Sequence, residues 1–403
     1  MKRLCATVVV AALALTAAGT ASADRRTGPR PDPTTLQRHA DALLDQGAPG
    51  VLVEVDTPGG TLRVRSGHGD VAARTPVPWR AKFRIGSYTK TFVAATVLQL
   101  VGEGRLSLED SVERWLPGVV AGNGNDGTKI TVRQLLQHTS GLYNYVGRMP
   151  ELFLERGFQE NRSRTVRPEE VVALAMREPP SFAPGTGWSY SNTGYALAGM
   201  IIERVTGNTW QHEVRVRIVE PLGLRGTYLP GTSPFIPRPH AVAYQRFPEK
   251  GLEADPADPR WGAPVDVTTY NPSWGGAAGD MISTTEDGNR FLQALLGGEV
   301  LRPAELAEMT RTVRAAEFDG AWPGARYGLG LMWTPNSCGG HWSHGGDIHG
   351  FMTRNGVTPD GTRSVVVSVN TDSMVPKTGT PAPTKDVTVD LVDHALCGPG
   401  ATP

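Results

Sequence analysis

Apolar and polar positions change period several times along the chain of 403 residues. Residues 35–46 repeat their apolar positions at the spacing of an amphipathic helix. Residues 50–56 and 61–66 alternate apolar and polar side chains, which is typical of half-buried strands. The four residues between them, Thr57-Pro58-Gly59-Gly60, have the composition of a turn, so the pattern predicts a hairpin. A helical pattern over 87–103 follows, ended by Gly102 and Gly104.

The middle and the end of the chain differ in their patterns. Between about residues 105 and 280, short helical patterns alternate with loops rich in glycine and proline, and we expect few strands there; the helices fall at 132–137, 168–177 and 195–205. A helix over 285–296 then precedes three strand-like runs and a closing helix over 385–396. The three runs, which we interpret as an antiparallel meander, are 328–333, 350–354 and 363–369.

Strands therefore lie near both ends of the chain, with a mainly helical region between them. This arrangement predicts an α/β (α+β) fold in which an antiparallel sheet is flanked by helices. We expect residues 35–86 and 285–397 to form the sheet domain and residues 87–284 to form an inserted, mainly helical domain. The active site would then lie at the interface between the two.

The N-terminus has the features of a secretory signal peptide. Lys2 and Arg3 precede an apolar run, and Ala21-Ser22-Ala23 matches a cleavage site, so residues 1–23 are expected to be removed; a buried N-terminal helix is the alternative. Residues 24–34 are polar and rich in proline, which predicts a flexible lead-in. No other run approaches the roughly 20 apolar residues of a membrane span. We therefore expect a secreted, extracellular protein without a membrane anchor.

Charge and cysteine content narrow the choice of partners. The 40 basic residues balance the 40 acidic ones, so nothing favours nucleic acid or an anionic membrane as a partner. Cys5 would be lost with the signal peptide, which leaves Cys338 and Cys397. In an oxidising compartment such a pair predicts one disulfide, with two free thiols as the alternative. The chain has no CxxC or HExxH pattern, so no zinc site is indicated. We also expect a monomer.

Ser87-Tyr88-Thr89-Lys90 is the first group of residues that could carry chemistry. Positions three apart share one face of a helix, so the Lys90 amine can reach the Ser87 hydroxyl. Serine is a weak nucleophile until a neighbouring base takes its proton, and burial can lower the pKa of a lysine enough for this role. Chance could produce so short a pattern, but of the seven lysines only Lys90 has a serine three residues before it.

Two further groups are candidates for the same site. Tyr190-Ser191-Asn192 ends a loop just before a predicted helix. Tyrosine can relay a proton and asparagine can hold a substrate amide, but a turn that caps the helix is the alternative. His344-Gly345-Gly346 lies among the predicted strands, where glycines let a substrate backbone approach closely. A purely structural histidine is the alternative for His344.

Two other motifs match by letter only. Lys377-Thr378-Gly379 spells a β-lactamase element that belongs on an interior strand, but the surrounding prolines cannot form one. Residues 122–127 match GxGxxG, yet no strand precedes them and no clear helix begins there. We interpret both segments as loops.

With Ser87–Lys90, Tyr190–Asn192 and His344–Gly346 in this order, the chain resembles the serine β-lactamase and penicillin-binding protein family. It is most similar to the secreted D-alanyl-D-alanine carboxypeptidases, with class C β-lactamases and family esterases further away. Residues 130–136 and 138–142 resemble a family signature in the helical domain. Cys338 and Cys397 resemble the paired cysteines of the carboxypeptidases. The resemblance implies the β-lactamase/transpeptidase-like fold and a reaction that uses no metal or organic cofactor.

The resemblance also implies roles for individual residues. Ser87 would attack a carbonyl and form an acyl-enzyme, with Lys90 and Tyr190 moving the proton. Asn192 would hold the acyl-side amide, and His344 would support proton transfer. The remaining predicted contacts with the substrate are the oxyanion hole, formed by the N–H groups of Ser87 and Asp347, and the cleft lining, which includes Trp274, Gly345, Gly346 and Asp347.

The chain departs from the carboxypeptidases where specificity is determined. In those enzymes an arginine after a Y-G-L-G-L segment and threonines around the third motif bind the terminal carboxylate of the substrate. Here residues 327–331 have that sequence but are followed by Met332, and Gly346 is followed by Asp347. An exposed Asp347 would repel a carboxylate and could attract an ammonium group.

Three functions remain open at this point. The first is a D-Ala-D-Ala carboxypeptidase-like serine hydrolase that acts on cell-wall peptides and is acylated by penicillins. The second is a D-aminopeptidase, amidase or esterase of the same family, which Met332 and Asp347 favour. The third is a non-catalytic protein that binds penicillin or peptidoglycan. In each case the expected ligand is a β-lactam, or a peptide or small molecule with a D-amino-acid centre.

Overall fold

The computed structural model describes residues 30–249, 261–381 and 383–398. The predicted signal peptide and most of the predicted lead-in lie outside the described residues. Within this part of the chain, nine antiparallel strands form one sheet, and β13 (Gly346–Ile348) joins its β14 strand outside the main order. That order is β2 (Gly60–Gly67), β1 (Gly50–Thr57), β15 (Ser364–Val369), β14 (Phe351–Val357), β12 (His341–Ser343), β11 (Met332–Thr334), β10 (Arg326–Tyr327) and β9 (Val313–Arg314).

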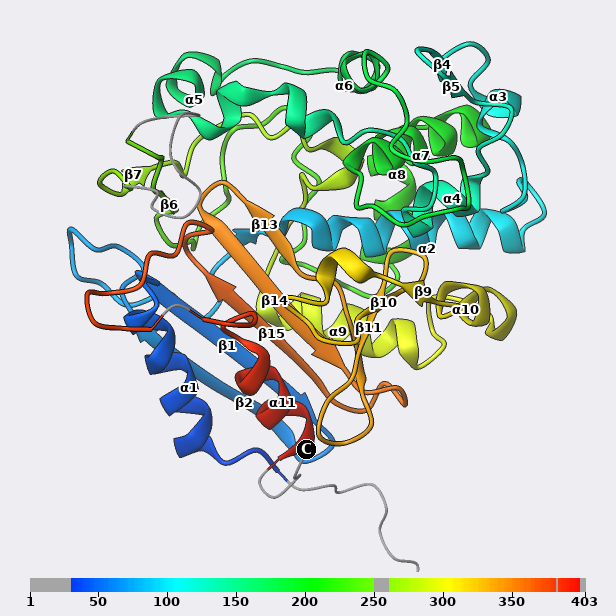
Figure 1. Ribbon diagram of the computed structural model, residues 1–403. Coiled ribbons are helices and arrows are strands. Elements are labelled where there is room, and N and C mark those ends of the chain that lie inside the picture. Colours follow the sequence, from blue (N-terminus) through cyan, green and yellow to red (C-terminus); the bar gives the residue numbers. More distant parts are fainter. Residues whose placement is uncertain (1–29, 250–260, 382, 399–403) are drawn as a thin grey trace, which may run out of the picture.

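Helices cover both faces of the sheet (Figure 1). On one face lie α1 (Pro33–Asp45) and α11 (Val389–Cys397), and on the other lies α9 (Thr285–Leu296). The sequence of β15 explains this layering, because its side chains alternate between the two faces. Val365, Val367 and Val369 pack with α1 and α11, while Val366 belongs to the core on the α9 side. An apolar residue at nearly every position is what a strand buried on both faces requires.

The rest of the described chain forms the mainly helical part above the sheet in Figure 1. Its central helix, α2 (Thr89–Gly102), is buried on all sides, which is why its sequence is apolar around the whole circumference. The helices around it are α3 (Val112–Trp115), α4 (Val132–Gln137), α5 (Glu155–Asn161), α6 (Pro168–Ala175), α7 (Asn192–Thr206), α8 (Trp210–Val214) and α10 (Pro303–Met309).

Three short strand pairs complete the described elements. Two of them are β4 (Ala121–Gly122) with β5 (Asn125–Asp126) and β6 (Tyr244–Gln245) with β7 (Val265–Asp266). The third pairs β3 (Phe83–Arg84) with β8 (Ile282–Ser283), so the two points where the chain passes between sheet and helical part lie side by side. The predicted domain boundaries stay predictions.

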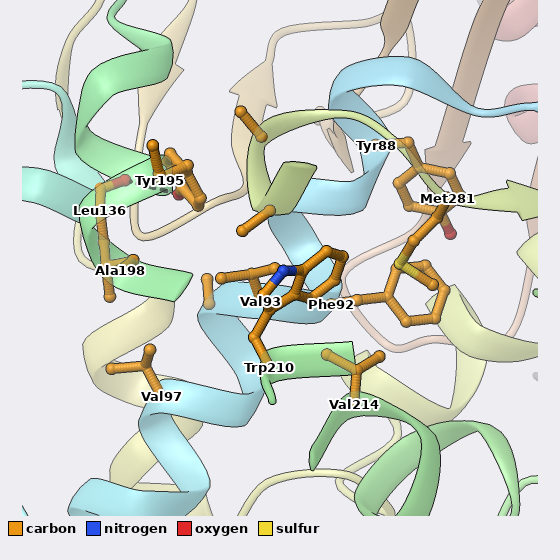
Figure 2. Close-up of a cluster of buried hydrophobic side chains, with 14 of the residues drawn as sticks. Tyr88, Phe92, Val93, Val97, Leu136, Tyr195, Ala198, Trp210, Val214 and Met281 are labelled. Atoms are coloured by element: carbon orange, nitrogen blue, oxygen red, sulfur yellow. Dashed lines mark hydrogen bonds between the residues drawn. The ribbon is translucent and has the colours of Figure 1, made fainter. Parts of the chain in front are cut away.

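Figure 2 shows the core where α2 meets its neighbours, with Phe92 between Tyr88, Val93 and Met281. The Phe92 ring stacks on that of Phe291 from α9, with centroids 3.7 Å apart. Because α9 also packs on the sheet, this stack connects the helical part to the sheet.

Most predicted elements are present. The hairpin and the helices at 35–46, 132–137 and 285–296 are confirmed within a residue or two. Cys338 and Cys397 are joined in the predicted disulfide, which connects the loop after β11 to α11.

Lys377-Thr378-Gly379 lies in a loop, as predicted, and the Lys377 Nζ pairs with Asp45. Among the described residues, no helix has both the length and the apolar sequence needed to cross a membrane.

Several predicted elements differ from the structure; the helix at 195–205 begins three residues earlier and the strand at 350–354 ends three residues later. The strand at 328–333 is divided, because Gly330 has φ +69° and the Gly328 N–H bonds to the Leu331 carbonyl, which makes a turn between β10 and β11. The predicted helix at 87–103 begins as a 3₁₀ turn, η1 (Gly86–Tyr88), and becomes α-helical at Thr89. The closing helix begins at Val389, four residues later than predicted. Residues 122–127 were expected to be a loop and contain part of the short β4–β5 hairpin.

Phe92→Ala tests the stack between α2 and α9. Loss of a fully buried ring leaves a cavity that the rigid core fills only in part, so we expect unfolding free energy to fall by about 3–5 kcal/mol. Urea unfolding followed by circular dichroism measures the change. The control is Phe153→Ala, whose side chain is 46% exposed and whose loss should cost less than about 1 kcal/mol. Equal costs for the two variants would contradict the assignment.

Candidate active site

Ser87 lies in η1, between β3 and α2, where the chain turns sharply at Gly86. Gly86 has φ +51°, a conformation that favours glycine, and a Cβ there would lie 3.0 Å from the Asp347 nitrogen. On the facing strand β13, a Cβ at Gly346 would lie 1.9 Å from the Ile85 oxygen and 2.8 Å from the Ser87 nitrogen. Two glycines therefore allow two backbones to approach, and this brings the Ser87 and Asp347 N–H groups close together.

Lys90 is completely buried on the first turn of α2. Its Nζ lies 2.9 Å from Ser87 Oγ, 2.7 Å from Asn192 Oδ1 and 2.6 Å from the Ala278 carbonyl oxygen. Burial lowers the pKa of Lys90 well below its usual value, because a charged amine loses its hydration there. A neutral amine donates its two hydrogens to the Asn192 and Ala278 oxygens. Its lone pair then remains for the proton of Ser87.

The predicted Tyr190 and Asn192 meet at Lys90. The half-buried Tyr190 ring has its centroid 4.9 Å from Lys90 Nζ. Burial raises the pKa of the Tyr190 hydroxyl, and a hydrogen bond with Ser87 partly opposes that rise. Asn192 begins α7 and also donates from Nδ2 to Asn144 Oδ1, at 3.2 Å. Ser87, Lys90, Tyr190 and Asn192 therefore form one connected group, although they come from distant parts of the chain.

His344 lies between β12 and β13, and its hydrogen-bond partners are not members of the group around Lys90. Its Nε2 is 2.7 Å from the Tyr327 hydroxyl, and its Nδ1 is 2.7 Å from the carbonyl oxygen of Gly345. The Tyr327 hydroxyl is also 3.2 Å from Nε2 of His138, whose Nδ1 accepts from the Ser191 N–H at 3.2 Å. His344 is therefore the end of a buried chain of hydrogen bonds that runs behind Tyr190.

The direction of each bond in this chain is fixed by its ends. Burial is the main cause that lowers the pKa of both histidines, that of His344 to about 3, so both rings are neutral. A backbone N–H can only donate, so His138 Nδ1 is bare and its Nε2–H donates to Tyr327. A carbonyl can only accept, so His344 carries its proton on Nδ1, and its Nε2 accepts from Tyr327. The tautomers of both rings are thereby determined.

Two cavities open beside Ser87, and Asn192 and Asp347 border both. The first, here called the aromatic cavity, has a volume of about 330 Å³ and a mainly apolar wall that includes the rings of Tyr145, Phe247, Trp261 and Trp274. The second has a volume of about 290 Å³ and contains the four predicted residues Tyr190, Met332, His344 and Gly345. Trp274, Met332 and Asp347 thus border the cleft, as the specificity argument from the sequence assumed.

Charge is concentrated in the second cavity. Arg354 of β14 binds Asp347 Oδ1 at 2.9 Å through Nη1 and Asp386 Oδ2 at 2.7 Å through Nε. Burial opposes the charge of Arg354, but the two carboxylates outweigh it and raise its pKa. Two negative charges therefore face one positive charge, and the Asp347 side chain is 54% exposed. Arg354 is the only cation among the described residues that border this cavity.

Sequence reasoning missed Arg354, Asp386 and Tyr327 as members of the site. Arg354 carried a usable signal, because it is a charged residue within the apolar sequence of β14. His138 and Tyr327 were noticed only as parts of longer motifs. Among the described residues, no group of three histidine, cysteine, aspartate or glutamate side chains is placed to hold a metal ion.

Comparisons with known proteins agree with this geometry. The Beta-lactamase family model matches residues 36–386. A D-stereospecific amidohydrolase from Streptomyces sp. has a solved structure that is 42% identical, with a TM-score of 0.77 over 85% of this chain and 95% of that one.

Curated relatives with other names also match. Esterase EstB of Burkholderia gladioli is 31% identical over 76% of this chain and 83% of its own length. Penicillin-binding protein 4* of Bacillus subtilis is 32% identical over 40% of this chain, which spans 33% of that protein. Since the family model covers most of the sequence and the antiparallel sheet with its flanking helices has the expected form, the chain belongs to the β-lactamase family of serine hydrolases.

Proposed function

We propose that this protein is a D-stereospecific amidohydrolase that cleaves amides and esters through an acyl-enzyme on Ser87. The observation that carries the proposal is the Lys90 amine, which lies 2.9 Å from Ser87 Oγ and is completely buried, so that its pKa is well below the usual lysine value. Similarity to the Streptomyces amidohydrolase over 95% of its chain supports the choice of substrate class.

The proposed reaction begins when Ser87 Oγ bonds to the substrate carbonyl carbon and its proton passes to Lys90 Nζ. The carbonyl electrons move onto oxygen, which the Ser87 and Asp347 N–H groups stabilise. Collapse of this intermediate breaks the carbon–nitrogen bond, and the leaving amine takes the proton from Lys90 through the Tyr190 hydroxyl. Water then attacks the ester by the reverse route, which releases the acid and restores Ser87.

The charges in the second cavity support an amidase over the carboxypeptidase that the sequence first suggested. A carboxypeptidase needs a cation for the terminal carboxylate of its substrate. Arg354 is already bound to the carboxylates of Asp347 and Asp386, and their surplus negative charge would repel the terminal carboxylate of a substrate. A neutral amide, an ester or an amine leaving group meets no such repulsion. Export through residues 1–23, acylation by β-lactams and a monomeric state stay proposals from the sequence.

Hydrolysis of three substrates by the wild type and by Ser87→Ala tests this function. We expect D-phenylalanine amide to be cleaved at least about tenfold faster, by kcat/KM, than its L-enantiomer and than diacetyl-Lys-D-Ala-D-Ala. Ser87→Ala should reduce kcat by about a thousandfold or more, whereas Ser163→Ala, at an exposed position, should not. Preference for the free carboxylate would restore the carboxypeptidase hypothesis. Binding of penicillin without turnover of any substrate would support the non-catalytic alternative.

Lys90→Arg tests the role of the neutral amine. Arginine keeps its charge at any pH used for enzymes, so it cannot take the Ser87 proton, and kcat/KM should fall by about 10²–10⁴. Because Lys90 must be neutral to take the proton, wild-type kcat/KM should rise as the pH passes through the pKa of Lys90, which burial places well below the usual lysine value. Lys129→Arg, on an exposed pair with Asp126, is the control. Activity of Lys90→Arg within a few-fold of the wild type would refute the assignment.

Tyr327→Phe tests whether the buried chain of hydrogen bonds positions His344. The change removes only the hydroxyl, which leaves His344 Nε2 without a donor. We expect kcat to fall by about tenfold with little change in KM. The pKa of His344 should rise from about 3 toward its usual range, which adds an ionisation on the acid side of the kcat/KM profile. A profile of unchanged shape, with the same loss of kcat, would indicate a merely structural hydroxyl.

A further inference from the structure

The aromatic cavity beside Ser87 continues along β13 to a second polar end. Gly346, at the start of this strand, contacts the Ser87 backbone, and His349 and Gly350 follow its last residue. At about 3.3 Å per residue, His349 lies roughly 10 Å from that contact. Both His349 and Asp372, which follows β15, border the cavity. An acyl group bound to Ser87 could therefore reach this end with a chain of several carbons.

His349 presents an acceptor that no described residue uses. Its Nε2 is 2.5 Å from the Leu152 carbonyl oxygen, and because a carbonyl only accepts, Nε2 carries the proton. Burial lowers the pKa of this ring to about 4, so the ring is neutral and Nδ1 has a free lone pair. The side chain is 6% exposed, and Nδ1 is buried without a hydrogen-bond partner among the described residues. A buried acceptor in this state costs free energy until a donor reaches it.

Asp372 presents a second acceptor at the same end. The Gln245 side chain lies beside its carboxyl group and accepts from the Gly350 N–H at 3.0 Å, but Asp372 Oδ1 is buried and has no partner in the described part of the chain. Burial, with a smaller contribution from the charge of Asp347, raises the pKa of Asp372 to about 8. No lysine or arginine of the described residues forms an ion pair with this carboxyl group. Such an acid is more stable when a cation binds beside it.

The wall between Ser87 and this end suits an alkyl chain. It includes the rings of Phe247, Trp261 and Trp274, and the Trp274 ring lies 5.7 Å from that of His349. Aromatic faces bury methylene groups favourably, and they also attract an ammonium group. The cavity thus combines an apolar passage with two unpaired acceptors at its end. Arg246 also borders the cavity, but its Nη1 donates to the Gly262 carbonyl oxygen at 2.7 Å.

We propose that Asp372 and His349 form a subsite for a primary ammonium group at the far end of the acyl part of the substrate. The ammonium would pair with the Asp372 carboxylate and donate to His349 Nδ1, so that both unpaired acceptors are satisfied. This inference rests on the proposed function, because it assumes that the acyl group bound to Ser87 occupies the aromatic cavity. It names the substrate class as acyl groups that end in an amine.

Paired substrates test the subsite. N-acyl-D-alanine p-nitroanilides with ω-amino acyl chains of increasing length are each compared with the chain in which a methyl group replaces the ammonium. The quantity measured is the ratio of kcat/KM within each pair, which cancels effects common to both substrates. We expect this ratio to reach about tenfold or more at one chain length, since hydrogen bonds to a charged group are strong. Asp372→Asn and His349→Leu should each bring the ratio down toward one.

Control variants and substrates distinguish failure of the ammonium subsite from failure of the proposed amidohydrolase function. Asp45→Asn, in an exposed pair with Lys377, should keep the wild-type ratio. A ratio near one at every chain length, with hydrolysis still dependent on Ser87, would overturn the ammonium subsite alone. So would an unchanged ratio in Asp372→Asn. If no substrate in either series is hydrolysed and Ser87→Ala changes nothing, then it is the proposed function that fails.

Discussion

Lys90 places an amine in an interior where its charge would lose nearly all of its hydration. The Asn192 side-chain oxygen and the Ala278 carbonyl oxygen accept the two hydrogens of the neutral amine. The lone pair of the nitrogen then faces the Ser87 hydroxyl. These partners come from η1, α7 and the 3₁₀ helix η6 (Gly276–Ala278), so all three segments must be in place for the amine to be satisfied. Because a buried polar group without partners costs several kcal/mol, the contact selects one arrangement of these segments. The site thus depends on the same burial that stabilises α2 in the core.

A second constraint acts from the sheet. β13 can approach the Ser87 turn only because Gly346 and Gly86 carry no side chain at the contact. This approach fixes the width of the cleft and divides the space beside Ser87 into an aromatic cavity and a charged one. Both cavities therefore border one short strand, whose Asp347 lines the two of them and whose end leads to His349.

One contact of the site could be predicted from local sequence alone, whereas Tyr190, Asn192 and His344 were assigned to the site through the family resemblance. Ser87 and Lys90 are three residues apart near the start of one helix, so helical geometry alone brings them together. The sheet order, by contrast, places Arg354 beside Asp347 and Asp386 through pairings between strands and a loop distant in sequence. No periodicity encodes such contacts. The prediction of one strand over 328–333 was wrong for a related reason. An apolar run does not reveal that Gly330 adopts a left-handed conformation, which makes a turn there.

The buried chain from Ser191 to Gly345 ends at both sides in backbone groups that neither gain nor lose protons during turnover. A proton can hop along hydrogen-bonded groups only if one end can accept it and the other can release it. Here each hydrogen bond already contains one proton, and the Ser191 N–H and the Gly345 carbonyl at the two ends neither release nor accept another. The chain therefore does not carry a proton along its own length. It holds the His138, Tyr327 and His344 side chains in one set of orientations beside Tyr190.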